Sequence, residues 1–173
     1  MAMTKERVEQ RLGGRLFAPS NWHQSLSERI RRPTARECAT MLSTGAEIAA
    51  SAHACTLEFN RITSRVDPEG KIQWTLHSHG LPKCFDALRK SVRDKVEEVG
   101  ELRMVHNPSP HITLSYSASE QLRETIWLDM PVRWTIKELL LAVGDGDPYR
   151  YEVIGRWPLL PEKDPPATQM GLF

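Results

Sequence analysis

The sequence predicts an α+β fold made of two helix-and-sheet halves. Stretches in which apolar residues recur at helical spacing are interspersed with stretches in which apolar and polar residues alternate at every second position. Gly and Pro residues separate these stretches and mark turns between them. The chain has 173 residues, enough for one domain or two joined lobes with a sizeable core.

Three helices are predicted from apolar residues that recur on one face. A short helix is expected over residues 4–12, and a long helix runs from Ala35 to about Ala50, with Thr34 as its N-cap. A further helix is expected from Leu81 to about Val99, where apolar residues recur three or four positions apart. The two longer helices therefore each follow a predicted strand region.

Alternation of apolar and polar residues predicts short strands between and after the helices. The expected strands cover residues 22–28, 54–65, 71–78, 108–116, 126–134, 136–144 and 151–160. The turn DPEG at residues 67–70 joins two of them into a hairpin. Residues 161–173 contain three prolines and are expected to form an extended or frayed tail.

Composition and charge are those of an ordinary globular protein. The net charge is +1 and 26% of the residues are charged, so no overall basic field indicates a nucleic-acid partner. Residues 1–36 nevertheless hold eight Lys or Arg against three Glu, a local balance that allows an anionic ligand near this part. The longest apolar run, near Leu139–Val143, is too short to cross a bilayer, so we expect a soluble cytoplasmic protein with no membrane partner.

Three cysteines, at positions 38, 55 and 84, make an odd count at irregular spacing. This pattern matches neither a disulfide framework nor a CxxC metal site. Cys38, Cys55 and Cys84 are therefore expected to be buried or incidental thiols.

Two segments share the pattern His-x-Ser/Thr-Leu, namely His23–Leu26 and His111–Leu114. On a strand, residues two apart share a face, so each segment would present an imidazole beside a hydroxyl. Two imidazoles can supply a base and an acid near neutral pH, and hydroxyls can donate to phosphate oxygens. This set suits phosphoryl transfer on a ribose phosphate without a metal or nucleotide cofactor, although strand histidines with purely structural roles would have the same spelling.

Further segments before, between and after the two motifs add to the pattern. RLGGRLFAPSNWHQSL leads into the first motif, GKIQWTLHS lies between the motifs, SPHITLSY contains the second, and RYEVIGRWPLL follows. Together these segments resemble the 2H phosphoesterase superfamily, and within it the LigT-like 2′-5′ RNA ligase family. The resemblance covers roughly residues 11–160.

This resemblance implies a fold, a reaction and a site. The fold would be a single bilobal domain over 1–160, in which two pseudo-symmetric lobes, each a small antiparallel sheet with outer helices, enclose a central cleft with one motif per lobe. His23 and His111 would be the catalytic acid/base pair, and Ser25 and Thr113 would bind the phosphate. The substrate would be RNA or a nucleotide with a 2′,3′-cyclic phosphate or a 2′-5′ linkage, with no metal and no cofactor.

Two features differ from the family pattern. Most members begin with a strand spelled like LFFAL, and the sequence predicts no such strand before the first motif. Many members also carry a phosphate-contacting arginine where this chain has Tyr116, whose phenol can bond to phosphate or stack on a base. Tyr116 is thus a substrate-binding candidate. The alternative function is a non-catalytic module of the same fold that binds an RNA end or a nucleotide.

The other histidines and the tryptophans have interpretations that need no catalytic or metal-binding role. His77 and His79 share a strand face and could form a metal pair, but surface or partly buried histidines are the favoured interpretation because no carboxylate or cysteine stands near at ligand spacing. His53 is expected in an exposed loop. The tryptophans at strand positions are expected mainly in the core, and these are Trp22, Trp74, Trp127, Trp134 and Trp157.

Overall fold

A computed structural model of the chain describes residues 9–10, 16–18, 21–27, 33–99, 109–145 and 150–165. The chain divides into two compact units. Unit 1 comprises Met1–Ser25, Leu57–Pro82 and Asn107–Trp134, and unit 2 comprises Leu26–Thr56, Lys83–His106 and Thr135–Phe173. Helices and antiparallel strands both contribute, which confirms the predicted α+β class.

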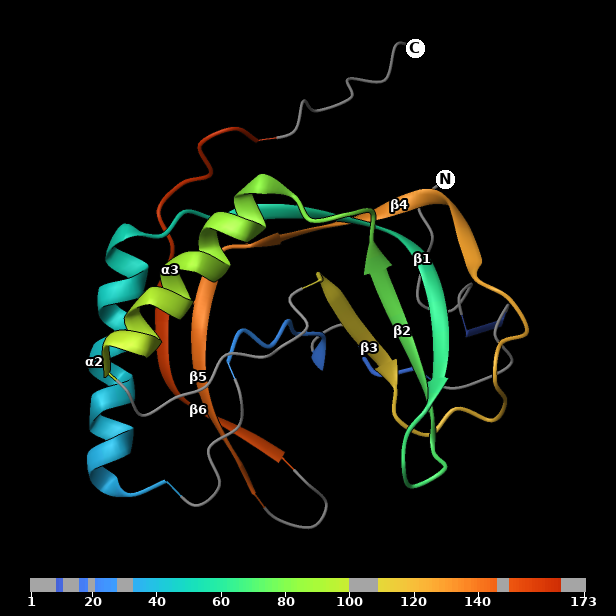
Figure 1. Cartoon of the computed structure of the whole chain (residues 1–173), viewed down its shortest axis with the longest axis horizontal. Helices are drawn as coiled ribbons and strands as arrows, with labels where there is room; N and C mark the ends of the chain where they lie inside the picture. Colours follow the sequence, from blue (N-terminus) through green and yellow to red (C-terminus); the bar gives the residue numbers. More distant parts are fainter. Residues whose placement is uncertain are drawn as a thin grey trace. The chain divides into compact units, whose positions relative to one another are not determined.

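A four-stranded sheet, with strand order β3-β2-β1-β4, contains most of the regular structure of unit 1 (Figure 1). Its strands are β1 (Cys55–Val66), β2 (Ile72–Ser78), β3 (His111–Ser115) and β4 (Ile126–Ile136). The predicted hairpin is confirmed, because β1 and β2 pair antiparallel around the DPEG turn. Gly70 adopts a φ of 80° in this turn, a conformation that glycine reaches without strain.

One face of this sheet is the apolar core of unit 1. Ile62, Leu76 and Ile112 lie side by side on β1, β2 and β3 and are each at most 2% exposed. Trp74 is fully buried, as predicted for a core tryptophan, and its Nε1–H donates to the carbonyl oxygen of Glu120 at 3.0 Å. Because side chains alternate along a strand, the residues immediately before and after Ile62, Leu76 and Ile112 have their side chains on the opposite face of the sheet.

Unit 2 contains α2 (Ala35–Ser51), α3 (Lys83–Val99) and a two-stranded sheet of β5 (Glu138–Asp145) and β6 (Arg150–Pro158). Helix α2 contacts α3 and both strands of the sheet (Figure 1). The predicted N-cap of α2 is confirmed. Thr34 Oγ1 accepts the Glu37 N–H, and Glu37 Oε2 accepts the Thr34 N–H at 2.6 Å, so two otherwise unpaired donors are satisfied.

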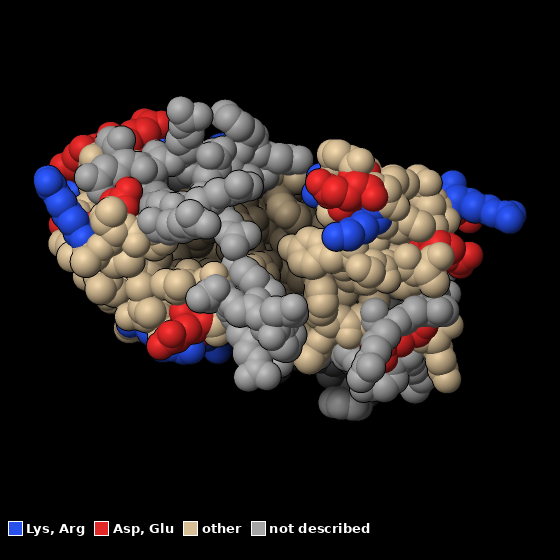
Figure 2. Space-filling view, turned by 90° about the horizontal axis from the view of Figure 1, so that it is seen from below, with Lys and Arg blue, Asp and Glu red and all other residues tan. Residues whose placement is uncertain are grey.

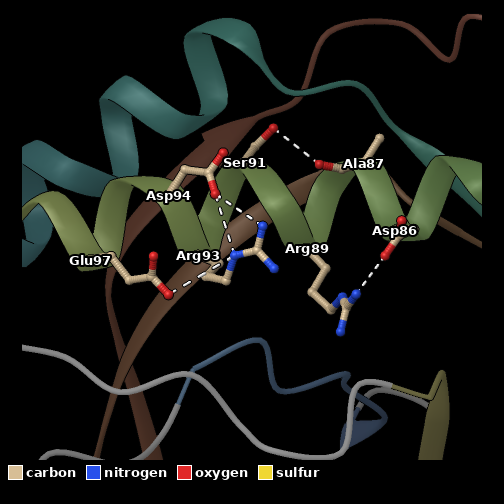
Figure 3. Close-up of polar contacts among 7 residues, drawn as sticks. All are labelled: Asp86, Ala87, Arg89, Ser91, Arg93, Asp94 and Glu97. Carbon is tan, nitrogen blue, oxygen red and sulfur yellow. Dashed lines mark hydrogen bonds and ion pairs between the residues drawn. The ribbon is translucent and has the colours of Figure 1, made fainter.

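Helix α3 is amphipathic, as its apolar spacing predicts. Its buried residues recur at helical spacing and are Phe85, Leu88, Val92 and Val96. Figure 3 shows charged pairs along its polar side, where Arg89 contacts Asp86 at 2.6 Å and Arg93 contacts Glu97 at 4.0 Å. Such exposed pairs contribute little stability each, so the buried face holds α3 in unit 2.

Charges of both signs are mixed on the described part of one face of the molecule. On the face in Figure 2, Lys and Arg side chains stand among Asp and Glu over a mostly uncharged area. This mixture agrees with the net charge of +1. Among the helices that the structure describes, none is long and apolar enough to cross a membrane.

Cys55 and Cys84 form a disulfide within unit 2, with their Cα atoms 5.4 Å apart, and Cys38 is free. The expectation of free thiols at 55 and 84 is therefore wrong. Their separation of 29 residues follows no recurrent spacing. They meet because the start of β1 and the first turn of α3 are adjacent in unit 2, which the sequence alone does not predict.

The first residues of the predicted tail form hydrogen bonds with the rest of unit 2. Leu160 bridges to His53, and Thr56 donates from its backbone N–H and its hydroxyl to Glu162, each at 2.7 Å. His53 is half-buried and its Nδ1 lies 2.6 Å from the carbonyl oxygen of Pro161, so it has a structural partner. Residues 166–173 lie outside the described residues.

Candidate active site in unit 1

The two His-x-Ser/Thr motifs are connected directly. The backbone N–H of His111 donates to Oε1 of Gln24, the second residue of the first motif, at 2.7 Å. The histidine and the hydroxyl residue of both motifs belong to unit 1, whereas one motif per lobe was expected. Besides the Gln24 bond, the Phe17 N–H donates to the Leu114 carbonyl oxygen at 2.8 Å, so residues close to the first motif contact the strand that carries the second.

The first motif is not on a strand, which corrects the expectation for residues 22–28. Residues 22–26 have no regular secondary structure. Phe17 of residues 16–18 bonds to β3 through its backbone, and Leu16 is only 5% exposed. Of the predicted helix over 4–12, residues 9 and 10 are helical, and the remainder lies outside the described residues.

Both motif imidazoles make the same hydrogen bond. Nδ1 of His23 lies 2.9 Å from the carbonyl oxygen of Asn21, and Nδ1 of His111 lies 2.9 Å from that of Ser109. A carbonyl oxygen can only accept, so Nδ1 must carry the proton in each bond. Nε2 is therefore the ring atom that can take up or release a proton in both histidines.

The hydroxyl and phenol candidates are also in unit 1. Ser25 is exposed, and Thr113 is half-buried opposite Thr75 of β2. Tyr116 is 47% exposed, and its ring centroid lies 5.5 Å from that of Phe17 in a tilted arrangement. The roles predicted for these three residues stay predictions.

The sequence did not predict that His77 lies beside His111 in the candidate site. His77 lies opposite His111 in the β2–β3 register, and the two ring centroids are 6.1 Å apart. Burial, followed by charge repulsion from His111, Arg61 and Arg65, lowers the pKa of His77 to about 4. His77 is therefore neutral near pH 7.

The metal interpretation of His77 and His79 has no support among the described residues. These contain no group of three or more His, Cys, Asp or Glu that could hold a metal ion. His79 is exposed, and His77 faces His111 instead.

Arg61 and Trp127 extend the same polar face across the sheet. Arg61 of β1 lies opposite His77, and its Nη1 donates to the Ser78 carbonyl oxygen at 2.6 Å. Its guanidinium carbon lies 5.9 Å from the ring centroid of Trp127 on β4. Trp127 is 57% exposed, so the expectation of a core position is wrong here.

Acidification is expected to destabilise the protein through His77. Its pKa is about 4 in the folded state and about 6.5 for an unperturbed imidazole, so between these values the unfolded chain binds more protons. Stability that is present above about pH 6.5 is therefore lost as the pH falls toward 4. Because His77 is only half-buried, solvent screens this contribution, and we expect an effect on the order of 1 kcal/mol.

Urea unfolding at neutral and acidic pH would measure this effect. The variant His77→Gln should lose less free energy of unfolding on acidification than the wild type, while His79→Gln, at an exposed position, should behave like the wild type. Equal acid losses in the wild type and His77→Gln would contradict the assignment.

The similarity of this chain to known proteins lies in its structure. No family model and no curated sequence matches the chain. TT0787 of Thermus thermophilus aligns with a TM-score of 0.66 and 21% identity over 91% of this chain and 88% of that one. A phosphoesterase aligns with a TM-score of 0.63 and 20% identity over 90% of this chain and 91% of that one.

LigT of E. coli, complexed with 3′-AMP, aligns with a TM-score of 0.64 and 20% identity over 92% of this chain and 94% of that one. The chain therefore has the LigT-like α+β fold. This confirms, at the level of the fold, the resemblance that the two motifs indicate.

Proposed function

We propose that this protein is a metal-independent 2H phosphoesterase that acts on RNA ends with a 2′,3′-cyclic phosphate or a 2′-5′ linkage. His23 and His111 are the general acid and base, and Ser25 and Thr113 donate hydrogen bonds to the phosphate oxygens. The observation that carries this proposal is the matching Nδ1–H bond of each imidazole to a backbone carbonyl. It leaves Nε2 of both rings as the atom for proton transfer.

Hydrolysis of a cyclic phosphate needs one proton removed and one delivered. Nε2 of one neutral histidine takes a proton from water as the water oxygen bonds to phosphorus. The bond from phosphorus to the ribose 3′ oxygen breaks, and Nε2–H of the other, charged histidine protonates that oxygen. The product is a 2′-phosphate, and a second proton exchange with solvent restores both rings.

Ligation uses the same groups with a different nucleophile. The 5′-hydroxyl of a second RNA end attacks in place of water, so a 2′-5′ phosphodiester forms without a nucleotide cofactor. Hydroxyl donors on the non-bridging oxygens would stabilise the charge that builds there in either reaction. No step in this scheme requires a metal.

The nucleotide complexes of a structural neighbour support the choice of substrate class. E. coli LigT has been crystallised with 3′-AMP, with ATP and with NADP+, all of which are nucleotides. Since this chain shares the fold, we extend nucleotide binding to it as part of the proposal.

Turnover of a nucleoside 2′,3′-cyclic phosphate in the presence of EDTA tests the function. We expect a nucleoside 2′-phosphate as product, detected by mass spectrometry, and a bell-shaped pH–rate profile, because one imidazole must be neutral and one charged. No turnover of cyclic mononucleotide or cyclic-phosphate RNA would refute the enzyme. Tight binding of RNA ends without turnover would instead favour the non-catalytic binding module.

A further inference from the structure

The polar face of the sheet carries one side chain from each strand beside the candidate site. His111 of β3 lies opposite His77 of β2, and His77 lies opposite Arg61 of β1. Arg61 in turn has its guanidinium over the Trp127 ring of β4. These four residues, here called the cross-sheet row, lead away from the second motif in strand order β3-β2-β1-β4.

The outer end of the cross-sheet row combines a cation with an exposed aromatic ring. Trp127 is 57% exposed, which is unusual for so large an apolar side chain on a strand. Arg61 is half-buried, and its bond from Nη1 to the Ser78 carbonyl oxygen holds the guanidinium in place. A ring for stacking and a fixed cation for phosphate are the two groups with which proteins bind single-stranded nucleic acid.

The part of the cross-sheet row between His111 and Arg61 can accommodate an anionic group. His77 is neutral near pH 7, because burial and nearby cations lower its pKa to about 4. It therefore separates His111 from Arg61 without adding a charge of its own. Arg65 on β1 adds a second cation, which is held by two hydrogen bonds to Oε1 of Gln73 at 3.1 and 2.9 Å.

The spacing along the row suits neighbouring nucleotides. Adjacent strands lie about 4.8 Å apart, so β3 and β1 are separated by about 10 Å. The side chain of Arg61 spans part of this separation, so its guanidinium can contact a group next to one that is bound at His111. A phosphate at His111 would thus leave the next nucleotide over Arg61 and Trp127.

We propose that Arg61 and Trp127 bind the nucleotide that precedes the reacting end, with its base stacked on Trp127 and its phosphate contacted by Arg61. This inference rests on the proposed function of His23 and His111. It names the preferred substrate as single-stranded RNA of two or more nucleotides rather than a mononucleotide.

The test compares two substrates of the same chemistry. One is a nucleoside 2′,3′-cyclic phosphate, and the other is a short oligoribonucleotide that ends in the same group. The wild type should have the higher kcat/KM for the oligoribonucleotide. In Trp127→Ala, the ratio of the two kcat/KM values should fall about 10-fold, which is the size of effect expected from loss of one stacked base. In Arg61→Gln, the ratio should also fall, because the variant lacks the cation that contacts the phosphate.

Two further variants separate stacking from a structural role. Trp127→Phe keeps an aromatic face and should retain most of the substrate ratio. Tyr151→Ala removes another exposed aromatic side chain, which belongs to unit 2, and should leave the ratio as in the wild type. A merely structural role of Trp127 would lower activity on both substrates alike, and an unchanged ratio in Trp127→Ala and Arg61→Gln would overturn the inference.

A binding measurement keeps the inference distinct from the proposed function. If the wild type turns over neither substrate, the enzyme proposal fails, and fluorescence anisotropy with a labelled oligoribonucleotide decides the inference by itself. Binding that weakens about 10-fold in Trp127→Ala supports the subsite. Binding that is absent or unaffected by this substitution refutes it.

Discussion

Asparagine in place of His111 is expected to lower kcat/KM for a 2′,3′-cyclic phosphate by about 10²- to 10⁴-fold, the usual contribution of a general acid or base. The asparagine amide can still donate to the Ser109 carbonyl oxygen, as Nδ1 of His111 does at 2.9 Å. It offers no group that takes up or releases a proton near neutral pH. The loss would therefore reflect proton transfer rather than local structure.

His23→Asn should have an effect of the same order, because each histidine performs one half of the proton exchange. The double variant should be little worse than the poorer single variant, since residues that act as a unit have non-additive effects. The measurement is steady-state turnover with EDTA, across a pH range that covers both limbs of the wild-type bell.

His79→Asn is the matched control, because His79 is an exposed histidine of the same unit. It should keep wild-type turnover. Activity in His23→Asn and His111→Asn that remains within a few-fold of the control would contradict the paired mechanism, even if the protein hydrolyses the substrate.

Local sequence signals predicted most elements because each signal acts within the element. The capping box at Thr34 and Glu37 requires only residues three apart, and the start of α2 follows it. Alternation at the start of β1 predicted which of its residues are buried, because the core covers only one face of the sheet there. The pair of motifs likewise indicated the LigT-like fold.

Features that depend on pairing between distant segments were not predictable. His77 and His111 are opposite because of the β2–β3 register, which a single sequence does not encode in any short pattern. Residues 22–26 were assigned a strand by alternation, yet they take no regular structure, and Gln24 bonds to His111 through its side chain instead. The disulfide between Cys55 and Cys84 depends on the same kind of long-range contact.

Alanine in place of Gly45 is expected to destabilise unit 2 by up to about 2 kcal/mol, as the net of two opposed effects. Alanine has the better helix propensity, by about 1 kcal/mol, and Gly45 lies inside α2. However, a Cβ at this position would lie 2.6 Å from Cζ3 of Trp157. Overpacking of this kind costs about 1–3 kcal/mol, and the clash should win because the indole ring cannot bend out of the way.

The ring of Trp157 has little room to retreat, because it also lies against Gly155 of its own strand. Urea unfolding of Gly45→Ala in the wild-type and Trp157→Leu backgrounds would separate the two effects. In the Trp157→Leu background the flexible leucine should yield to the new methyl group, and Gly45→Ala should become neutral or stabilising. Ala46→Gly, at an exposed position of the same helix, is the control that measures the propensity difference alone. A stabilising Gly45→Ala in the wild-type background would show that propensity outweighs the contact with Trp157.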